Sequence, residues 1–294
     1  MFLVIAFHNL LTKHACLRHV MCALGYLVLI AFYIFATSLT SIYCVHRFNF
    51  DLILTYEAVS LIWAVILCVL IKGASIFRST KEQLHVAWKI YKPMIVIAFL
   101  NALLSVPLLF QSLPAPNVFH SVLYQIILCV YVGFSEEVLF RGVIFHGCLK
   151  IFSSCRHKLL LSCIVVALIF GAFHIAWNKI DVHDEIQLAQ IMGKILQTGL
   201  CSVLFCLAVY KTKSIIGVSL LHALDDLILM IIPFGILGHP VSTDYVVKGA
   251  DGISLAIFYA VLVLVYVYPI IRGIKLFKTL PEVTILPRQQ KFYE

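Results

Sequence analysis

Eight long runs of residues with few or no charged side chains constrain this chain more than any other feature of its sequence. A run of about 20 apolar residues, folded as an α-helix, crosses the roughly 30 Å hydrocarbon core of a bilayer. With 62% hydrophobic and 12% charged residues, the chain has about half the charge of a typical soluble protein. The sequence predicts an all-α, polytopic membrane helix bundle of about eight transmembrane helices. The runs are 20–45, 52–71, 94–113, 118–149, 159–176, 195–210, 214–237 and 253–271.

The distribution of Lys and Arg predicts the orientation of these spans, because cytoplasmic loops of membrane proteins collect basic residues. With the N-terminus inside, seventeen of the 22 Lys and Arg residues fall on the inner side and one, Arg141, lies within a span. The outer side holds only Arg47, Lys179, Lys194 and Lys248. Both termini are therefore predicted to be cytoplasmic. The formal charge of +8 is explained by these loops and needs no nucleic-acid partner.

The segments between the spans are mostly short, so no separate soluble domain is expected. Residues 1–11 are apolar but too short to span, and no basic segment precedes them, which favours an interfacial segment over a cleaved signal peptide. Two longer outer loops are expected at 177–194, with a short interfacial helix, and at 238–252. Glu57 interrupts the second run, where we expect it to make an interhelical hydrogen bond or to line a substrate site.

Ionisable side chains near the middle of three spans require an explanation, because each costs about 2.5–3.5 kcal/mol at the centre of a membrane helix. In two of these spans, the ionisable residues lie four apart and so share one helix face. Counting about 1.5 Å per residue from the flanking basic residues gives the three groups a similar depth. We therefore expect one buried polar site inside an apolar bundle. Its residues are Glu136, Glu137, Arg141, His174, His222 and Asp226.

The spacing of these residues resembles the three motifs of the CAAX protease and bacteriocin-processing family, the Rce1-like or Abi intramembrane proteases. The motifs read Glu136-Glu137-x-x-x-Arg141, Phe170-x-x-x-His174 and His222-x-x-x-Asp226. The resemblance covers about residues 120–230 and implies a protease core over 118–237. Residues 1–117 hold spans without a recognisable motif, and 238–294 hold an outer loop, the last span and a basic cytoplasmic tail.

The resemblance implies hydrolysis of a peptide bond by a water molecule that Glu136 activates, with His174 orienting the carboxylate. His222, supported by Asp226, would stabilise the tetrahedral intermediate. The third motif departs from the family, because members with CAAX activity usually carry Asn where this chain has Asp226. A carboxyl group donates a hydrogen bond only when it is protonated, so this substitution bears on the oxyanion role.

The remaining pair of the first motif has a positioning role in the same comparison. Arg141 would keep Glu137 ionised and fix the helix at the edge of the site. The resemblance leaves metal use open: glutamate alone, or a zinc ion held by His174, His222 and a carboxylate, with water as the fourth ligand. The implied partners are the lipid bilayer and a membrane-anchored or prenylated, CAAX-type peptide or protein, and the implied location is the plasma membrane.

Two other classes of function remain open at this point. The polar residues could serve a non-catalytic membrane scaffold or a bacteriocin self-immunity protein, with Glu137 and Arg141 as a simple intrahelical ion pair. A proton- or solute-coupled transporter could use the carboxylates as a relay, although the sequence shows neither the inverted repeat nor the broken-helix pair typical of such proteins.

Overall fold

The computed structural model describes residues 15–241 and 245–293, and this part of the chain is helical with no β-strand. The predicted all-α membrane architecture is confirmed, because seven of the described helical segments are long and apolar enough to cross a bilayer. α8 is apolar but shorter, so the count of eight stays a prediction. The predicted interfacial segment 1–11 lies outside the described residues. The helices are α2 (Ala15–Phe48), α3 (Leu52–Leu70), α4 (Lys81–Ala102), α5 (Leu108–Gln111), α6 (Val118–Glu137), α7 (Phe145–Ile151), α8 (Lys158–Phe173), α9 (Glu185–Thr212), α10 (Ile216–Met230), α11 (Ala250–Thr279) and α12 (Pro287–Tyr293).

Shorter helical pieces join or extend these helices. Three are 3-10 turns: η1 (Ala74–Phe77), η2 (Leu103–Ser105) and η4 (Trp177–Lys179). Two are π-helical, η3 (Val138–Ile144) and η5 (Ile231–Ile236). Because η3 joins α6 to α7 without a break, residues 118–151 form one continuous helical rod with a widened turn in its middle.

Two helices begin ten or more residues before the apolar runs that predicted them. α4 begins at Lys81 because Thr80 and Gln83 form a reciprocal capping box. The main-chain N–H of Gln83 donates to Thr80 Oγ1, and the main-chain N–H of Thr80 donates to Gln83 Oε1. α9 begins at Glu185, after the Asp184 cap, so the predicted 177–194 loop is wrong in its second half. Lys194 lies inside α9 and not in an outer loop. Because the first turns of these helices contain polar and charged residues, a search for uncharged runs places their starts too late.

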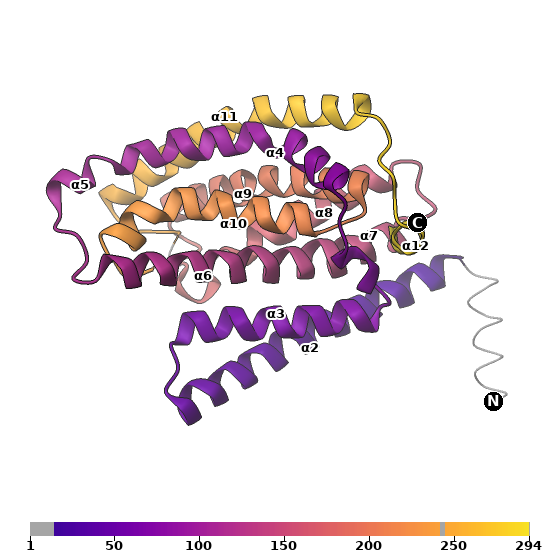
Figure 1. The fold of residues 1–294 in the computed structure, drawn as a ribbon, viewed down its shortest axis with the longest axis horizontal. Helices are drawn as coiled ribbons and strands as arrows, with labels where there is room; N and C mark the ends of the chain where they lie inside the picture. Colours follow the sequence, from indigo (N-terminus) through magenta and orange to yellow (C-terminus); the bar gives the residue numbers. More distant parts are fainter. Residues whose placement is uncertain (1–14, 242–244, 294) are drawn as a thin grey trace.

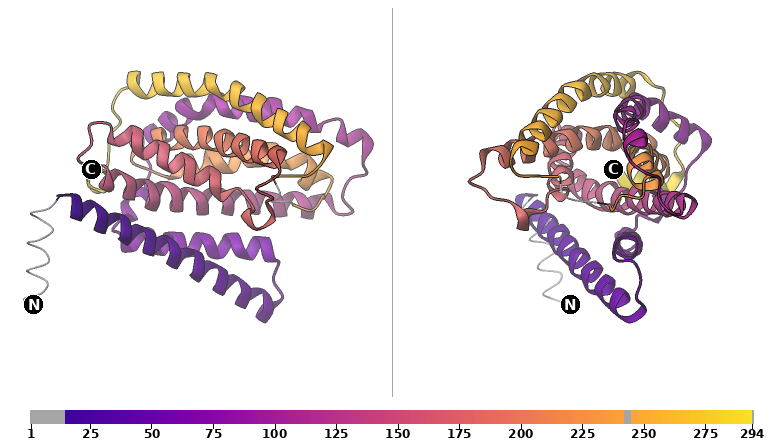
Figure 2. Two further views of the ribbon diagram at one scale, coloured as in Figure 1. Left: turned by 180° about the vertical axis from the view of Figure 1, so that it is seen from behind. Right: turned by 90° about the vertical axis from the view of Figure 1, so that its left-hand side faces the viewer.

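The long helical rod of α6, η3 and α7 lies between two groups of helices (Figure 1). On one side, α2 and α3 form a pair that leans away from the rest, with α3 against α6. On the other side, α8, α9 and α10 cover the rod, and α4 and α11 form the outer layer beyond them (Figure 2). The described start of α2 and helix α12 lie at the same end of the bundle, and the cytoplasmic location of both termini stays a prediction.

Two glycines allow helix backbones to touch beside the predicted site. A Cβ on Gly133 of α6 would lie 2.7 Å from the amide nitrogen of Ala223 in α10. A Cβ on Gly171 of α8 would lie 2.5 Å from the carbonyl oxygen of Ile195 in α9. Real side chains do not approach backbone this closely, so only glycine fits, as at other close helix crossings in membranes. The first contact joins two motif-bearing helices, α6 and α10, and the second joins the third, α8, to α9.

The C-terminal segment packs into the bundle and is not a free basic tail over its whole length. The side chain of Gln289 is fully buried and donates hydrogen bonds to the carbonyl oxygens of Ser75 and Arg78. Tyr293 is 1% exposed, and its hydroxyl donates to the carbonyl oxygen of Arg141 at 3.3 Å. α12 therefore supports the π-helical segment η3 from the end of the bundle.

Candidate active site

The first motif lies where the continuous rod changes from α-helix to π-helix. Glu136 and Glu137 are the last two residues of α6, and Arg141 lies in η3. A π-helical turn inserts an extra residue into the helix and occurs often at functional sites. Glu137 and Arg141 still meet across one turn, with 2.9 Å between Glu137 Oε1 and an Arg141 guanidinium nitrogen.

Arg141 and Glu137 form a buried ion pair that contacts residues of α8 and α9. Both side chains are fully inaccessible to solvent. The guanidinium also donates to Ser202 Oγ of α9 at 3.0 Å. Its carbon atom lies 4.5 Å from the Phe170 ring centroid and 5.0 Å from that of Phe205, within the range of cation–π attraction. The predicted Glu137–Arg141 pair is thus present, and it is tied to α8 and α9.

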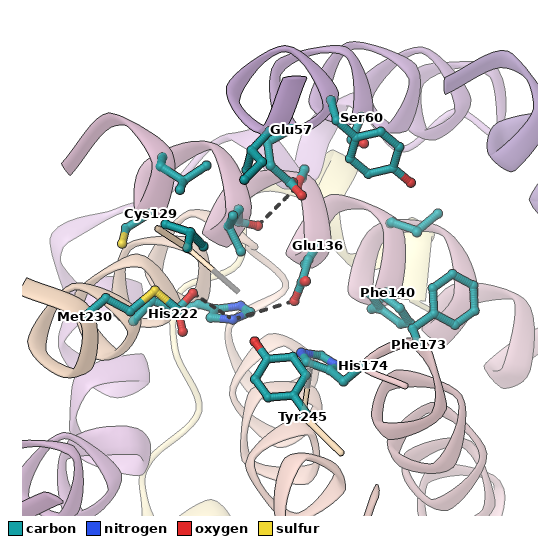
Figure 3. A pocket seen from close by; sticks show the side chains of 18 of the residues that line it. Glu57, Ser60, Cys129, Glu136, Phe140, Phe173, His174, His222, Met230 and Tyr245 are labelled. Atoms are coloured by element: carbon teal, nitrogen blue, oxygen red, sulfur yellow. Dashed lines mark hydrogen bonds and ion pairs between the residues drawn. The ribbon is translucent and has the colours of Figure 1, made fainter. Parts of the chain in front are cut away.

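His222 connects this ion pair to the rest of the predicted site. Its Nδ1 lies 2.8 Å from Glu137 Oε1. A carboxylate that is paired with Arg141 only accepts hydrogen bonds, so Nδ1 carries a hydrogen. The other ring nitrogen, Nε2, then points toward Glu136 Oε2 at 3.7 Å and Asp226 Oδ2 at 3.6 Å (Figure 3). Both distances exceed a direct hydrogen bond, so Nε2 remains available to a bound molecule.

His174 ends α8 and faces the same space from another side (Figure 3). Its Nδ1 lies 2.8 Å from the carbonyl oxygen of Phe170. Because a carbonyl oxygen only accepts, this nitrogen carries the hydrogen and the Nε2 of a neutral ring is left as an acceptor. No direct hydrogen bond joins His174 to Glu136 in the described part of the chain, so the expected orienting role of His174 stays a prediction.

A cavity of about 340 Å³ brings four of the six predicted residues to one surface. Glu136, His174, His222 and Asp226 line it, whereas Glu137 and Arg141 lie behind this wall. Glu136 Oε2 is buried and has no hydrogen-bond partner within residues 15–241 and 245–293. A carboxylate oxygen that is desolvated but unpaired is costly, which favours a role in contacting a bound molecule.

The cavity wall also contains residues that carry no motif. Ser135 Oγ of α6 donates to Glu57 Oε2 of α3 at 2.9 Å, and Glu57 lines the cavity opposite Glu136. The predicted interhelical hydrogen bond of Glu57 is confirmed, whereas its role in lining a substrate site stays a prediction. Tyr245, from the loop before α11, covers the site beside His174, and burial raises the pKa of its hydroxyl. Its position in a turn-rich loop gave no signal in the sequence.

The described side chains do not form a metal site. No three His, Cys, Asp or Glu side chains within the described ranges converge as ligands of one ion. His222 Nδ1 is engaged by Glu137 and His174 Nδ1 by a main-chain carbonyl, which leaves one nitrogen of each ring. The zinc ligand set of His174, His222 and a carboxylate is not assembled in this arrangement, because no three such side chains of the described ranges converge, and no step below depends on a metal.

Comparison with known sequences agrees with the geometry. The family described as type II CAAX prenyl endopeptidase, Rce1-like, matches residues 117–228, which include all six predicted site residues. The match spans α6 to most of α10 and omits α2, α3, α4 and α11. No curated protein and no solved structure matches the chain. The resemblance in the three motifs is confirmed over residues 117–228, which are similar to the Rce1-like family of type II CAAX prenyl endopeptidases.

Proposed function

We propose that this chain is an intramembrane endopeptidase that hydrolyses a peptide bond in a membrane-anchored or prenylated, CAAX-type substrate with water activated by Glu136. One observation carries the proposal: the unpaired oxygen of Glu136 and the Nε2 atom of His222 face each other across 3.7 Å at the wall of a cavity. A base and a possible oxyanion donor on the same surface are the minimum that amide hydrolysis requires.

Glu136 acts as the general base and then as the general acid. Its carboxylate takes a proton from a water molecule in the cavity as the water oxygen attacks the scissile carbonyl carbon. The carbonyl π electrons move to the oxygen and form a tetrahedral oxyanion. When this collapses and the C–N bond breaks, protonated Glu136 returns the proton to the leaving amine, and a new carboxyl group and a new amino terminus are formed.

His222 is the candidate donor to the oxyanion. Three carboxylates, on Glu136, Glu137 and Asp226, lie within 3.7 Å of its ring, and their negative charge stabilises a ring that carries hydrogens on both nitrogens. In that state Nε2 donates to the developing oxyanion. Arg141 and Glu137 are positioning residues, because they hold Nδ1 of His222 and so fix the direction of Nε2.

The cavity fits a substrate that is embedded in the membrane. It lies between the α2–α3 pair and the rod, and most of its wall is apolar apart from the polar cluster. Its apolar residues include Ile34, Ile53, Leu128, Val132 and Phe140. An isoprenoid or a hydrophobic peptide segment buries more apolar surface against such a wall than a polar peptide does. We propose a place in the plasma membrane, with the end that holds α12 in the cytoplasm, from the excess of Lys and Arg at that end.

The test is cleavage of a prenylated CAAX peptide by the purified protein in detergent or liposomes. Glu136→Gln keeps the size and polarity of the side chain but removes the base, so we expect a loss of about 10²–10⁴-fold in kcat. Glu185→Gln is the matched control, because it makes the same change at an exposed residue of α9 outside the cavity. The control should cleave at the wild-type rate.

New peptide termini identified by mass spectrometry decide the result. Products that form with the wild type and with Glu185→Gln, but not with a folded Glu136→Gln variant, would support the mechanism. Cleavage by Glu136→Gln at the wild-type rate would remove Glu136 from it. No cleavage by the folded wild type of any membrane peptide would favour the non-catalytic scaffold or immunity role.

A further inference from the structure

A second cavity, of about 300 Å³, lies on the other side of the polar cluster. The two cavities share five wall residues, which are His174, His222, Asp226, Met230 and Tyr245. The second cavity extends away from α2 and α3 to the end of α4 and to α9 and α11. A peptide whose scissile bond lies at Glu136 and His222 can therefore continue past these residues into a separate space.

Lys194 is the unexplained group in this second cavity. It lies nine residues into α9, about 14 Å from the start of the helix, and is partly buried. A lysine at such depth is costly and usually marks a binding or transport role. Its Nζ lies 3.9 Å from the Tyr245 ring centroid and 3.4 Å from Gln197 Oε1. Within the described residues, no carboxylate lies within ion-pair distance of this ammonium group.

The face of α9 around Lys194 presents further polar groups. Lys194, Gln197 and Thr198 follow the i, i+3, i+4 spacing that places side chains on one face, and all three line the second cavity. Thr198 Oγ1 and Lys194 Nζ both donate to Gln197 Oε1. An ammonium group has three hydrogens to donate, and this long contact with a neutral amide uses one of them.

The acidic residues of the cavity lie on α10. Asp225 and Asp226 line the second cavity together with Lys194, and Asp226 Oδ2 lies 3.6 Å from His222 Nε2. Lys194 is the only Lys or Arg that lines either cavity within the described part of the chain. An anionic group of a bound molecule would therefore lie against α9, and Lys194 alone would fix its position.

We infer that the second cavity holds the part of the substrate that follows the scissile bond, and that the Lys194 ammonium group binds the free carboxylate at the substrate's C-terminus. This inference rests on the proposed function. A CAAX-type box ends three residues after the prenylated cysteine, so the leaving fragment is short and carries that carboxylate. The cavity nearer α2 and α3 would receive the membrane-anchored part of the same substrate.

The experiment compares two prenylated peptides that differ only at their C-terminus, a free acid and an amide. The wild type should cleave the acid about 10- to 100-fold more efficiently in kcat/KM, the range expected for one charge-assisted hydrogen bond. Lys194→Met should reduce this preference to about onefold. Lys248→Met, which removes an exposed lysine outside both cavities, should keep the full preference.

Each result has one interpretation. Equal cleavage of acid and amide by the wild type would overturn the carboxylate subsite while the proposed protease function stands. An unchanged preference in Lys194→Met would do the same. If Lys194→Met does not fold, Lys194→Arg should retain the preference and Lys194→Gln should lose it. No cleavage of either peptide by the folded wild type would refute the proposed function itself, and with it this inference.

Discussion

Replacing Arg141 with Met should be among the most destabilising single substitutions in this chain. The change leaves Glu137, which is fully buried, without the cation 2.9 Å away. Removing one partner of a buried ion pair costs about 3–5 kcal/mol, chiefly because the remaining charge stays desolvated. The hydrogen bond to Ser202 and the stacking on Phe170 and Phe205 are lost as well. We expect Arg141→Met to lower the free energy of unfolding by about 3–5 kcal/mol.

The double variant isolates the charge. Adding Glu137→Gln to Arg141→Met removes the uncompensated carboxylate, so the double variant should be at least about 1 kcal/mol more stable than Arg141→Met alone. The matched control is the pair between Lys211 and Glu282, which lie 2.7 Å apart with Glu282 82% exposed. Glu282→Gln should cost less than about 1 kcal/mol, because an exposed ion pair contributes little.

Reversible unfolding in mixed micelles, followed by circular dichroism, measures these differences. The ordering Arg141→Met least stable, double variant intermediate and Glu282→Gln near the wild type is required by the argument. If Arg141→Met costs no more than Glu282→Gln, the pair is not desolvated as the structure has it. If the loss of stability in the double variant equals the sum of the losses in Arg141→Met and in Glu137→Gln alone, Arg141 does not act by compensating Glu137.

Three further perturbations test other parts of the structure. Gly133→Ala should destabilise the bundle by about 1–3 kcal/mol, measured by the same unfolding assay, because the added Cβ meets the main chain of Ala223. Asp226→Asn should retain or increase peptide cleavage, since an amide donates to the oxyanion without needing a proton; complete loss would show that the carboxylate itself is required. Hydrogen bonds from Gln187 lower the pKa of Asp184 below its ordinary 3.8. The ionised Asp184 cap therefore stabilises α9 above pH 3.8, and this stabilisation is lost as the pH falls through the lowered pKa. Thermal unfolding from pH 6 to pH 3 should depend less on pH in Asp184→Asn than in the wild type.

The helices and the grouping of the site were predictable from the sequence because both follow from local rules. Uncharged runs located the membrane helices, and the four-residue spacing of Glu137 with Arg141 placed them on one face even though the helix there is π-helical. The network around His222 was only partly predictable. Its i, i+4 relation to Asp226 was visible, but the 2.8 Å contact with Glu137 joins residues 85 positions apart and depends on how α6 and α10 cross.

The contributions from outside the three motifs could not be predicted in this way. Lys194 was assigned to an outer loop because a charged residue next to an apolar run is usually taken as the end of that run. In the structure Asp184 caps α9, so the helix starts before Lys194 and includes it. Tyr245 and the end of α12 reach the site from segments with no periodic pattern. Their positions are set by packing between distant parts of the chain, for which one sequence offers no local signal.

The matched segment 117–228 therefore contains the proposed catalytic residues but not the whole wall of either cavity. Glu57 of α3 accepts the hydrogen bond from Ser135, the residue before Glu136, so the α2–α3 pair is linked to the helix end that carries the proposed base. Tyr91 of α4 and Tyr266 of α11 line the second cavity, and Tyr293 of α12 supports the carbonyl oxygen of Arg141. The proposed catalytic groups thus lie in the segment that carries the family motifs, whereas the walls of both cavities and the support of the π-helical turn extend to helices where the sequence carries no motif.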